Sequence, residues 1–126
     1  MFKSRGKLRY GKTRFWAVVD CDIGFCDYYK KLYSQATHRT RQLMAPMWGA
    51  HITVVRNEVP PKLVRWNAHE GEIIEFTWYP GVDNNGVHYW LDVECERLHK
   101  IRIELGLDRK PIYPFHMTIG NRKHEQ

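Results

Sequence analysis

The tripeptide His-x-Thr occurs twice in this chain, as His51-Ile52-Thr53 and as His116-Met117-Thr118. Each copy lies in a short run of apolar or β-branched residues without an internal Gly or Pro, which predicts a β-strand. Residues i and i+2 of a strand point to the same face, so each motif should present an imidazole beside a hydroxyl group, with its apolar neighbours turned toward a core. Two such strands brought together would set two titratable groups and two hydroxyl donors around one small space.

This set of side chains is suited to proton transfer at a phosphodiester. Imidazole titrates at about pH 6.5, so one histidine can accept a proton from the nucleophile while the other, already charged, protonates the leaving oxygen. Thr53 and Thr118 would hold the non-bridging oxygens, where charge builds up in the transition state. The sequence leaves open which of His51 and His116 is the base. It also leaves open a structural alternative, in which both are half-buried strand residues bonded to backbone groups.

The elements that must position the two motifs are strands interrupted by two helices. Apolar stripes at helical spacing predict helices from about residue 24 to 44 and from about residue 95 to 105, the second ending at Gly106. A short turn or helix is expected after Pro60-Pro61. Strands are predicted at residues 15–20, 50–55, 72–79, 87–94 and 115–119, with turns at Pro80-Gly81 and at residues 83–86. At 126 residues these elements form one domain of the α+β class.

The order of these elements contains an internal repeat. Residues 15–20 are followed by a helix and the first motif, and residues 89–94 by a helix and the second motif. Aligning Trp16 with Trp90 makes the second helix about two turns shorter than the first. Two such halves would bring both motifs close to a pseudo-twofold axis. The alternative is that aromatic-apolar strands simply look alike.

The paired motifs, each closing a similar half, resemble the 2H phosphoesterase superfamily, which is named for its paired His-x-Thr/Ser motifs. The half-repeat extends this resemblance over about residues 15–120. The resemblance implies a bilobal fold with two pseudo-symmetric, antiparallel-rich sheet lobes, outer helices and a central cleft. It also implies metal-independent chemistry on RNA-type phosphodiesters by His51, Thr53, His116 and Thr118. The context Trp48 to Arg56 is similar to a phage-encoded branch that degrades cyclic oligonucleotide signals of bacterial CBASS defence.

Four further side chains are candidates for substrate binding. Arg56, just past the first motif strand, could clamp a phosphate with two hydrogen bonds, or be a solvated strand-end charge. Tyr10, Trp78 and Trp90 could stack on a base, although an aromatic residue in such a position is more often part of the core than a ligand contact. Trp90 shares a strand face with His88 and Asp92, and this polar face could line the cleft.

The net charge of +6 is concentrated at the N-terminus. Residues 1–14 contain six basic residues and no acidic one, and the other 14 basic residues match the 14 acidic residues of the chain. We therefore expect a basic arm over residues 1–14 and a single neutral domain over residues 15–126. Such an arm would attract a polyanion or a small phosphorylated ligand, or would be a solvated terminus.

The remaining composition excludes several classes of protein. No apolar run approaches the roughly 20 residues of a membrane helix, and the basic N-terminus lacks the apolar stretch of a secretory signal. The three cysteines, Cys21, Cys26 and Cys95, have no paired spacing, which favours a reducing cytoplasm over a disulfide framework. The seven histidines and three cysteines show no zinc-site spacing, so we expect neither a metal nor a cofactor.

The sequence hypothesis is a cytoplasmic, metal-independent phosphodiesterase that cleaves cyclic oligonucleotide second messengers. One alternative is an enzyme that processes RNA ends carrying a 2′,3′-cyclic phosphate. A non-enzymatic alternative is a catalytically silent module that binds nucleotides or RNA.

Overall fold

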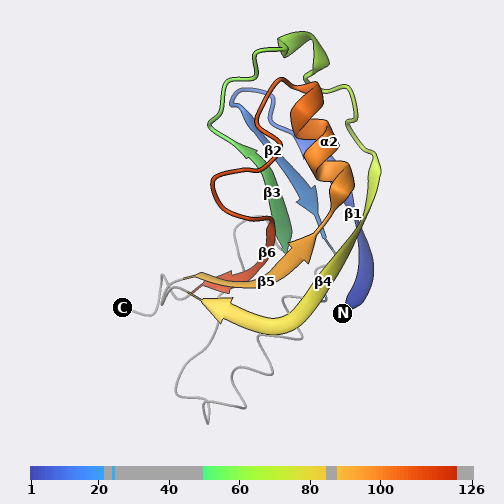
Figure 1. The fold of residues 1–126 in the computed structure, drawn as a ribbon, viewed down its shortest axis with the longest axis vertical. Helices are drawn as coiled ribbons and strands as arrows, with labels where there is room; N and C mark the ends of the chain where they lie inside the picture. Colours follow the sequence, from blue (N-terminus) through green and yellow to red (C-terminus); the bar gives the residue numbers. More distant parts are fainter. Residues whose placement is uncertain (22–23, 25–49, 85–87, 122–126) are drawn as a thin grey trace.

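The computed structural model describes residues 1–21, 24, 50–84 and 88–121 (Figure 1). The predicted strands at residues 15–20, 50–55, 87–94 and 115–119 and the second predicted helix are confirmed, with bounds shifted by a few residues at most. A short 3-10 turn follows Pro60-Pro61 as expected. The predicted helix at residues 24–44, apart from Gly24, and the turn at Asn85-Gly86 lie outside the described residues. The elements in chain order are β1 Phe2–Tyr10, β2 Trp16–Asp20, β3 His51–Arg56, η1 Leu63–Arg65, β4 Ile73–Asn84, β5 His88–Glu94, α2 Glu96–Glu104 and β6 His116–Asn121.

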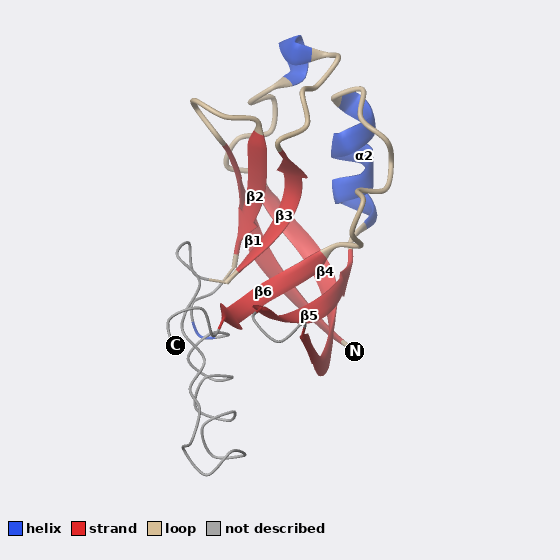
Figure 2. Ribbon diagram, turned by 90° about the vertical axis from the view of Figure 1, so that its left-hand side faces the viewer, coloured by secondary structure: helices blue, strands red, loops and turns tan. Residues whose placement is uncertain are grey.

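The six strands of the described residues form one closed antiparallel barrel in the order β1-β2-β3-β6-β5-β4. The first three strands and the last three are arranged alike, and the halves join where β3 meets β6 and where β1 meets β4. Figure 2 shows α2 beside the barrel. The described part of the chain is thus a small, mostly-sheet domain with one α-helix, compatible with the expected α+β class. Among these residues, no helix has the length and apolarity to cross a bilayer.

Each strand has a core face and an opposite face, which we call the motif face because it carries the His-x-Thr side chains. The alternation of buried and more exposed residues follows the period of two that a strand with one buried face requires, throughout β5 and as far as Val54 in β3 and Ile119 in β6. Helix α2 buries Leu98, Ile101 and Leu105 in the same apolar cluster as the core faces, as its stripe predicts. The core faces of the strands contribute Leu8, Ala17, Val19, Ile52, Ile74, Phe76, Tyr89, Leu91, Val93, Met117 and Ile119 to this cluster.

The predicted N-terminal arm requires a correction, because most of it is strand β1. Residues Phe2–Tyr10 pair with β2 on one side and with β4 on the other. Gly6, Leu8 and Tyr10 are buried. The positive charges of Lys3, Arg5, Lys7 and Arg9 occupy the alternate positions, on the motif face. The charged residues mask this alternation in the sequence, and Gly is a poor strand former, so the strand was missed.

The predicted turn at Pro80-Gly81 is also wrong, because β4 continues through it to Asn84. The pairing with β5 runs from Trp78↔Val93 to Val82↔Leu91, so three residues of β4 lie opposite one residue of β5. The proline and glycine therefore sit in a β-bulge, where a missing backbone N–H is tolerated.

Candidate active site

The two motif strands are direct neighbours and run antiparallel. His51 pairs with Thr118 and Ile52 pairs with Met117. The same register, continued by one residue, sets Thr53 opposite His116. The histidine of each motif therefore faces the threonine of the other. All four side chains are half-buried, while Ile52 and Met117 between them are completely buried.

This register gives the dimensions of the site. Residues directly opposite in an antiparallel pair have Cβ atoms roughly 4.5–5.5 Å apart, and diagonal neighbours lie roughly 7–8 Å apart. His51 and Thr118 are an opposite pair, whereas His51 and His116 are diagonal neighbours. The register therefore sets the two motif histidines roughly 7–8 Å apart on one face.

Each motif threonine is followed directly by a β-bulge. In β3, Thr53 pairs with Val18 but Val55 pairs with Ala17, so Val54 is an extra residue. In β6, Thr118 pairs with Trp90 but Gly120 pairs with Tyr89, so Ile119 is the extra residue. The repeated bulge supports the equivalence of the two halves independently of the motif letters.

The first bulge turns Arg56 onto the motif face. Arg56 is five residues after His51, and in a regular strand an odd separation would put the two side chains on opposite faces. With the extra residue Val54, Arg56 pairs with Trp16 and shares the face of Asp20 and His51. Arg56 is exposed at the end of β3, as a phosphate clamp would be.

A buried arginine stabilises the bulge from the core side. Arg102 of α2 is 1% exposed, and its Nη1 donates a hydrogen bond of 2.8 Å to the carbonyl oxygen of Val54, the bulge residue. The same guanidinium makes two hydrogen bonds of 2.8 Å with the Glu58 carboxylate, and its Nε donates to the Asp108 carbonyl oxygen. The hydrogen bonds from Arg102 hold the pKa of Glu58 below its ordinary value.

The imidazole of His116 has a defined orientation. Its Nδ1 lies 2.9 Å from the carbonyl oxygen of Pro114. A carbonyl oxygen only accepts hydrogen bonds, so Nδ1 carries the proton and Nε2 is left for chemistry. The ring of Trp90 lies against the imidazole, with 5.6 Å between ring centroids. Trp90 and His88 share the motif face with Asp92, as the sequence predicts.

Each motif histidine also has an aspartate opposite it on the outer neighbouring strand. Asp20 of β2 pairs with His51, and Asp92 of β5 pairs with His116. Sequence reasoning placed Asp92 on a face that could line the cleft, but it selected neither aspartate as a site residue. It matched Trp16 with Trp90 by residue type, whereas the pairing makes Trp90 equivalent to Val18 and Asp92 equivalent to Asp20. A two-residue shift of that alignment would have revealed an aspartate in each half.

The two aspartates differ in their own partners. Arg9 makes two hydrogen bonds with Asp20, of 2.7 and 3.0 Å, and its guanidinium lies 4.9 Å from the Trp16 ring centroid. The hydrogen bonds to Asp20 raise the pKa of Arg9, which remains charged. Asp92 is exposed and has no ion pair with any residue that the structure describes.

Two of the residues predicted to bind substrate do not lie on the motif face. Tyr10 is 3% exposed, belongs to the core and makes an edge-on contact with Trp66. Burial raises the pKa of its phenol. Trp78 is on the core face, where its ring packs against Phe2 and its Nε1 donates to Ser4 Oγ at 3.1 Å. Of the eight predicted site residues, the motif face therefore carries His51, Thr53, His116, Thr118, Arg56 and Trp90.

Within the described ranges, no group of three or more histidine, cysteine, aspartate or glutamate side chains has the geometry of a metal site. Comparison of the chain with protein-family models, curated proteins and solved structures finds no match.

Proposed function

We propose that the protein is a metal-independent phosphodiesterase of the 2H type, with His51, Thr53, His116 and Thr118 as its catalytic residues. The observation that carries the proposal is the antiparallel pairing of the two motifs, which sets His51 opposite Thr118 and, if the register is continued by one residue, His116 opposite Thr53. In the bilobal fold of that superfamily the motif face of the barrel would be the floor of the cleft between the lobes.

The reaction we propose is an in-line displacement at phosphorus. One histidine accepts the proton of the attacking hydroxyl, and the new P–O bond forms opposite the leaving oxygen. The other histidine, charged at the start, gives its proton to the leaving oxygen as the old P–O bond breaks. The total protonation of the pair is unchanged, so no further proton donor is needed. His116 acts through Nε2, since its Nδ1 is bonded to Pro114.

Three side chains would stabilise the negative charge that develops on the non-bridging phosphate oxygens. Thr53 and Thr118 donate hydrogen bonds to the non-bridging oxygens, one from each motif strand. Arg56, turned to the same face by the bulge at Val54, clamps a phosphate oxygen pair. Trp90, which is half-buried and already packs on the His116 imidazole, would stack on a base.

We propose a cyclic oligonucleotide as the substrate, with the ribose 2′-hydroxyl as nucleophile. The products would be a linear oligonucleotide with a 2′,3′-cyclic phosphate and a free 5′-hydroxyl. The same groups can add water to a 2′,3′-cyclic phosphate, so RNA ends belong in the same assay.

The test is incubation of the full chain in excess EDTA with cyclic dinucleotides, cyclic trinucleotides and short RNAs ending in 2′,3′-cyclic phosphate. Cleavage should persist in the chelator and fall by about 100-fold or more in both His51→Ala and His116→Ala. His88→Ala, which removes an exposed imidazole of the same face, is the matched control and should keep activity. A 2′-deoxy cyclic substrate should remain intact.

Three outcomes would reject parts of this proposal. Loss of cleavage on adding EDTA would reject metal independence. Intact substrates with tight binding would identify a silent binding module. Equal activity in His116→Ala and His88→Ala would remove His116 from the mechanism.

A further inference from the structure

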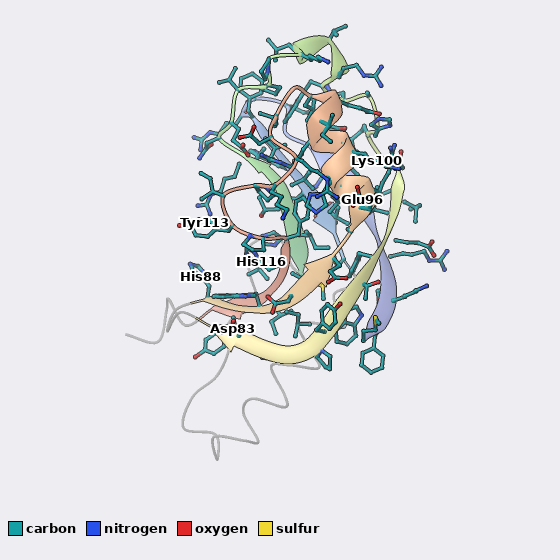
Figure 3. The ribbon with its side chains drawn as sticks, viewed as in Figure 1. Asp83, His88, Glu96, Lys100, Tyr113 and His116 are labelled. Atoms are coloured by element: carbon teal, nitrogen blue, oxygen red, sulfur yellow. The ribbon has the colours of Figure 1, made fainter. Side chains whose placement is uncertain are left out.

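The loop between α2 and β6, residues 107–115, exposes two large apolar side chains at its tip. Ile112 is 89% exposed and Tyr113 is 75% exposed. His116 follows Tyr113 by three residues, a stretch of chain that spans at most roughly 11 Å. In Figure 3 the side chains of Tyr113 and His116 lie on the same side of the molecule, with Tyr113 further from the barrel.

This loop is bonded to α2 at both ends, so its tip is not a loose segment. At the start of the loop, Arg102 Nε donates to the Asp108 carbonyl oxygen at 2.8 Å, and His99 Nδ1 donates to the Arg109 carbonyl oxygen at 2.6 Å. At its end the Phe115 ring is buried and packs on the His99 ring, with 4.7 Å between centroids.

Two prolines further restrict the tip. Pro111 and Pro114 flank Ile112-Tyr113 directly, and a residue before proline is confined to extended backbone conformations. The carbonyl of Pro114 also accepts the Nδ1 proton of His116. The backbone that carries the tyrosine therefore also orients the imidazole. A ring presented in this way loses little conformational entropy when a flat ligand stacks on it.

We propose that Tyr113 is a nucleobase-binding residue, which stacks on a purine or pyrimidine of the substrate beside His116. This inference rests on the proposed function. It adds a base subsite on the side of His116 where the loop between α2 and β6 lies. Trp90 contacts the same imidazole from β5. A phosphodiester at the motif would thus have aromatic rings from two separate elements within reach of its neighbouring bases.

The test compares a substrate that carries a base with one that lacks it. Nucleoside 2′,3′-cyclic phosphate and the corresponding abasic ribose 2′,3′-cyclic phosphate are assayed with the wild-type chain, Tyr113→Ala and Tyr113→Phe. Tyr113→Ala should raise KM for the nucleoside substrate by about 5- to 100-fold and leave KM for the abasic substrate unchanged. Tyr113→Phe keeps the ring and should behave as wild type. Val64→Ala, which truncates another strongly exposed apolar residue, on η1, is the control for surface truncation.

A second readout does not depend on turnover. Binding of a cyclic dinucleotide with 2′-deoxyribose, measured by calorimetry, should weaken by the same factor in Tyr113→Ala. Equal KM values for wild type and Tyr113→Ala with both substrates would overturn the inference, as would an equal loss with both. A change in the sedimentation coefficient of the free protein in Tyr113→Ala, with KM unchanged, would assign the tip to protein contacts and also overturn it. If the wild-type chain neither cleaves nor binds any of these compounds, the proposed function itself fails.

Discussion

The two halves of the barrel place the same motif on the same face but surround it differently. His51 has Asp20 opposite it, and Arg9 already binds that carboxylate through two hydrogen bonds. His116 has the exposed Asp92 opposite it and an aromatic ring, Trp90, against its imidazole. The position equivalent to Trp90 in the first half is Val18, which is fully buried.

Under the proposed function, this difference distinguishes the catalytic groups from the groups that recognise the substrate. The central groups, two imidazoles and two hydroxyls, obey the pseudo-twofold relation, and the proposed reaction needs the same proton transfer and hydrogen bonding on either side of the phosphate. The flanking groups do not obey it: the cation Arg56 lies on the first half, and Trp90, whose ring contacts the His116 imidazole, lies on the second. A substrate bound here would accordingly have one preferred direction across the barrel.

The most demanding test of the symmetric centre is to remove each threonine hydroxyl in turn. Thr53→Val and Thr118→Val should each lower kcat by about 100- to 1,000-fold, since each removes one donor to the transition-state oxygens. The two losses should agree within a factor of about ten. The rate of cleavage is measured under single-turnover conditions in the presence of EDTA.

Thr53→Ser and Thr118→Ser are the matched controls for that experiment, because serine keeps the hydroxyl. Both should retain most of the activity. If one valine variant lost all activity and the other lost none, the two threonines would not be equivalent in the reaction.

The next largest effect is expected where α2 supports the first bulge. Arg102→Met removes the bonds to Val54, Glu58 and Asp108 and leaves a carboxylate without its partner. The free energy of unfolding in urea should fall by about 3–5 kcal/mol. Arg65→Met, which breaks the exposed pair with Glu104, should cost less than about 1 kcal/mol. Equal losses in the two variants would show that the bulge does not depend on Arg102.

Much of this arrangement could be predicted from the sequence, because it depends on local alternation. The motif strands, the face shared by His88, Trp90 and Asp92, and the buried stripe of α2 all follow from side-chain period alone. Strand β1 was missed because its alternation is between cations and a core that includes Gly6.

The rest could not be predicted, because it depends on which strand pairs with which and in what register. Tyr10 and Trp78 are aromatic residues in strands, which made them candidates for stacking on a base. The strand pairing places both side chains on the core face. The side chain of Arg56 lies on the motif face only because β3 contains one extra residue. No residue type in the sequence predicts that insertion. A bulge appears only when two strands are compared.

A smaller, pH-dependent effect tests the same support of the first half. Because hydrogen bonds from Arg102 hold the pKa of Glu58 below its ordinary value of 4.5, the ionised carboxylate stabilises the fold at neutral pH. That stability is complete above the unfolded-state pKa and is lost as the pH falls through the folded-state pKa. The difference in unfolding free energy between the wild type and Glu58→Gln should therefore be constant above about pH 5 and shrink toward pH 3. A difference that stays constant down to pH 3 would contradict this coupling.

The smallest expected effect concerns the carboxylates beside the two histidines. Arg9 and Asp20 retain 39% and 35% of their side-chain exposure, so solvent screens their attraction. A double-mutant cycle with Arg9→Gln and Asp20→Asn should give a coupling energy of about 0.2–1 kcal/mol in urea unfolding, reduced at high salt. Asp92→Asn, at the equivalent position of the second half, should change stability by less than about 0.5 kcal/mol, because Asp92 has no ion pair with any described residue. If Asp92→Asn lowered the unfolding free energy as much as Asp20→Asn, Asp92 would have a structural partner of its own. The presence of an ion pair at Asp20 and its absence at Asp92 would then no longer distinguish the two halves.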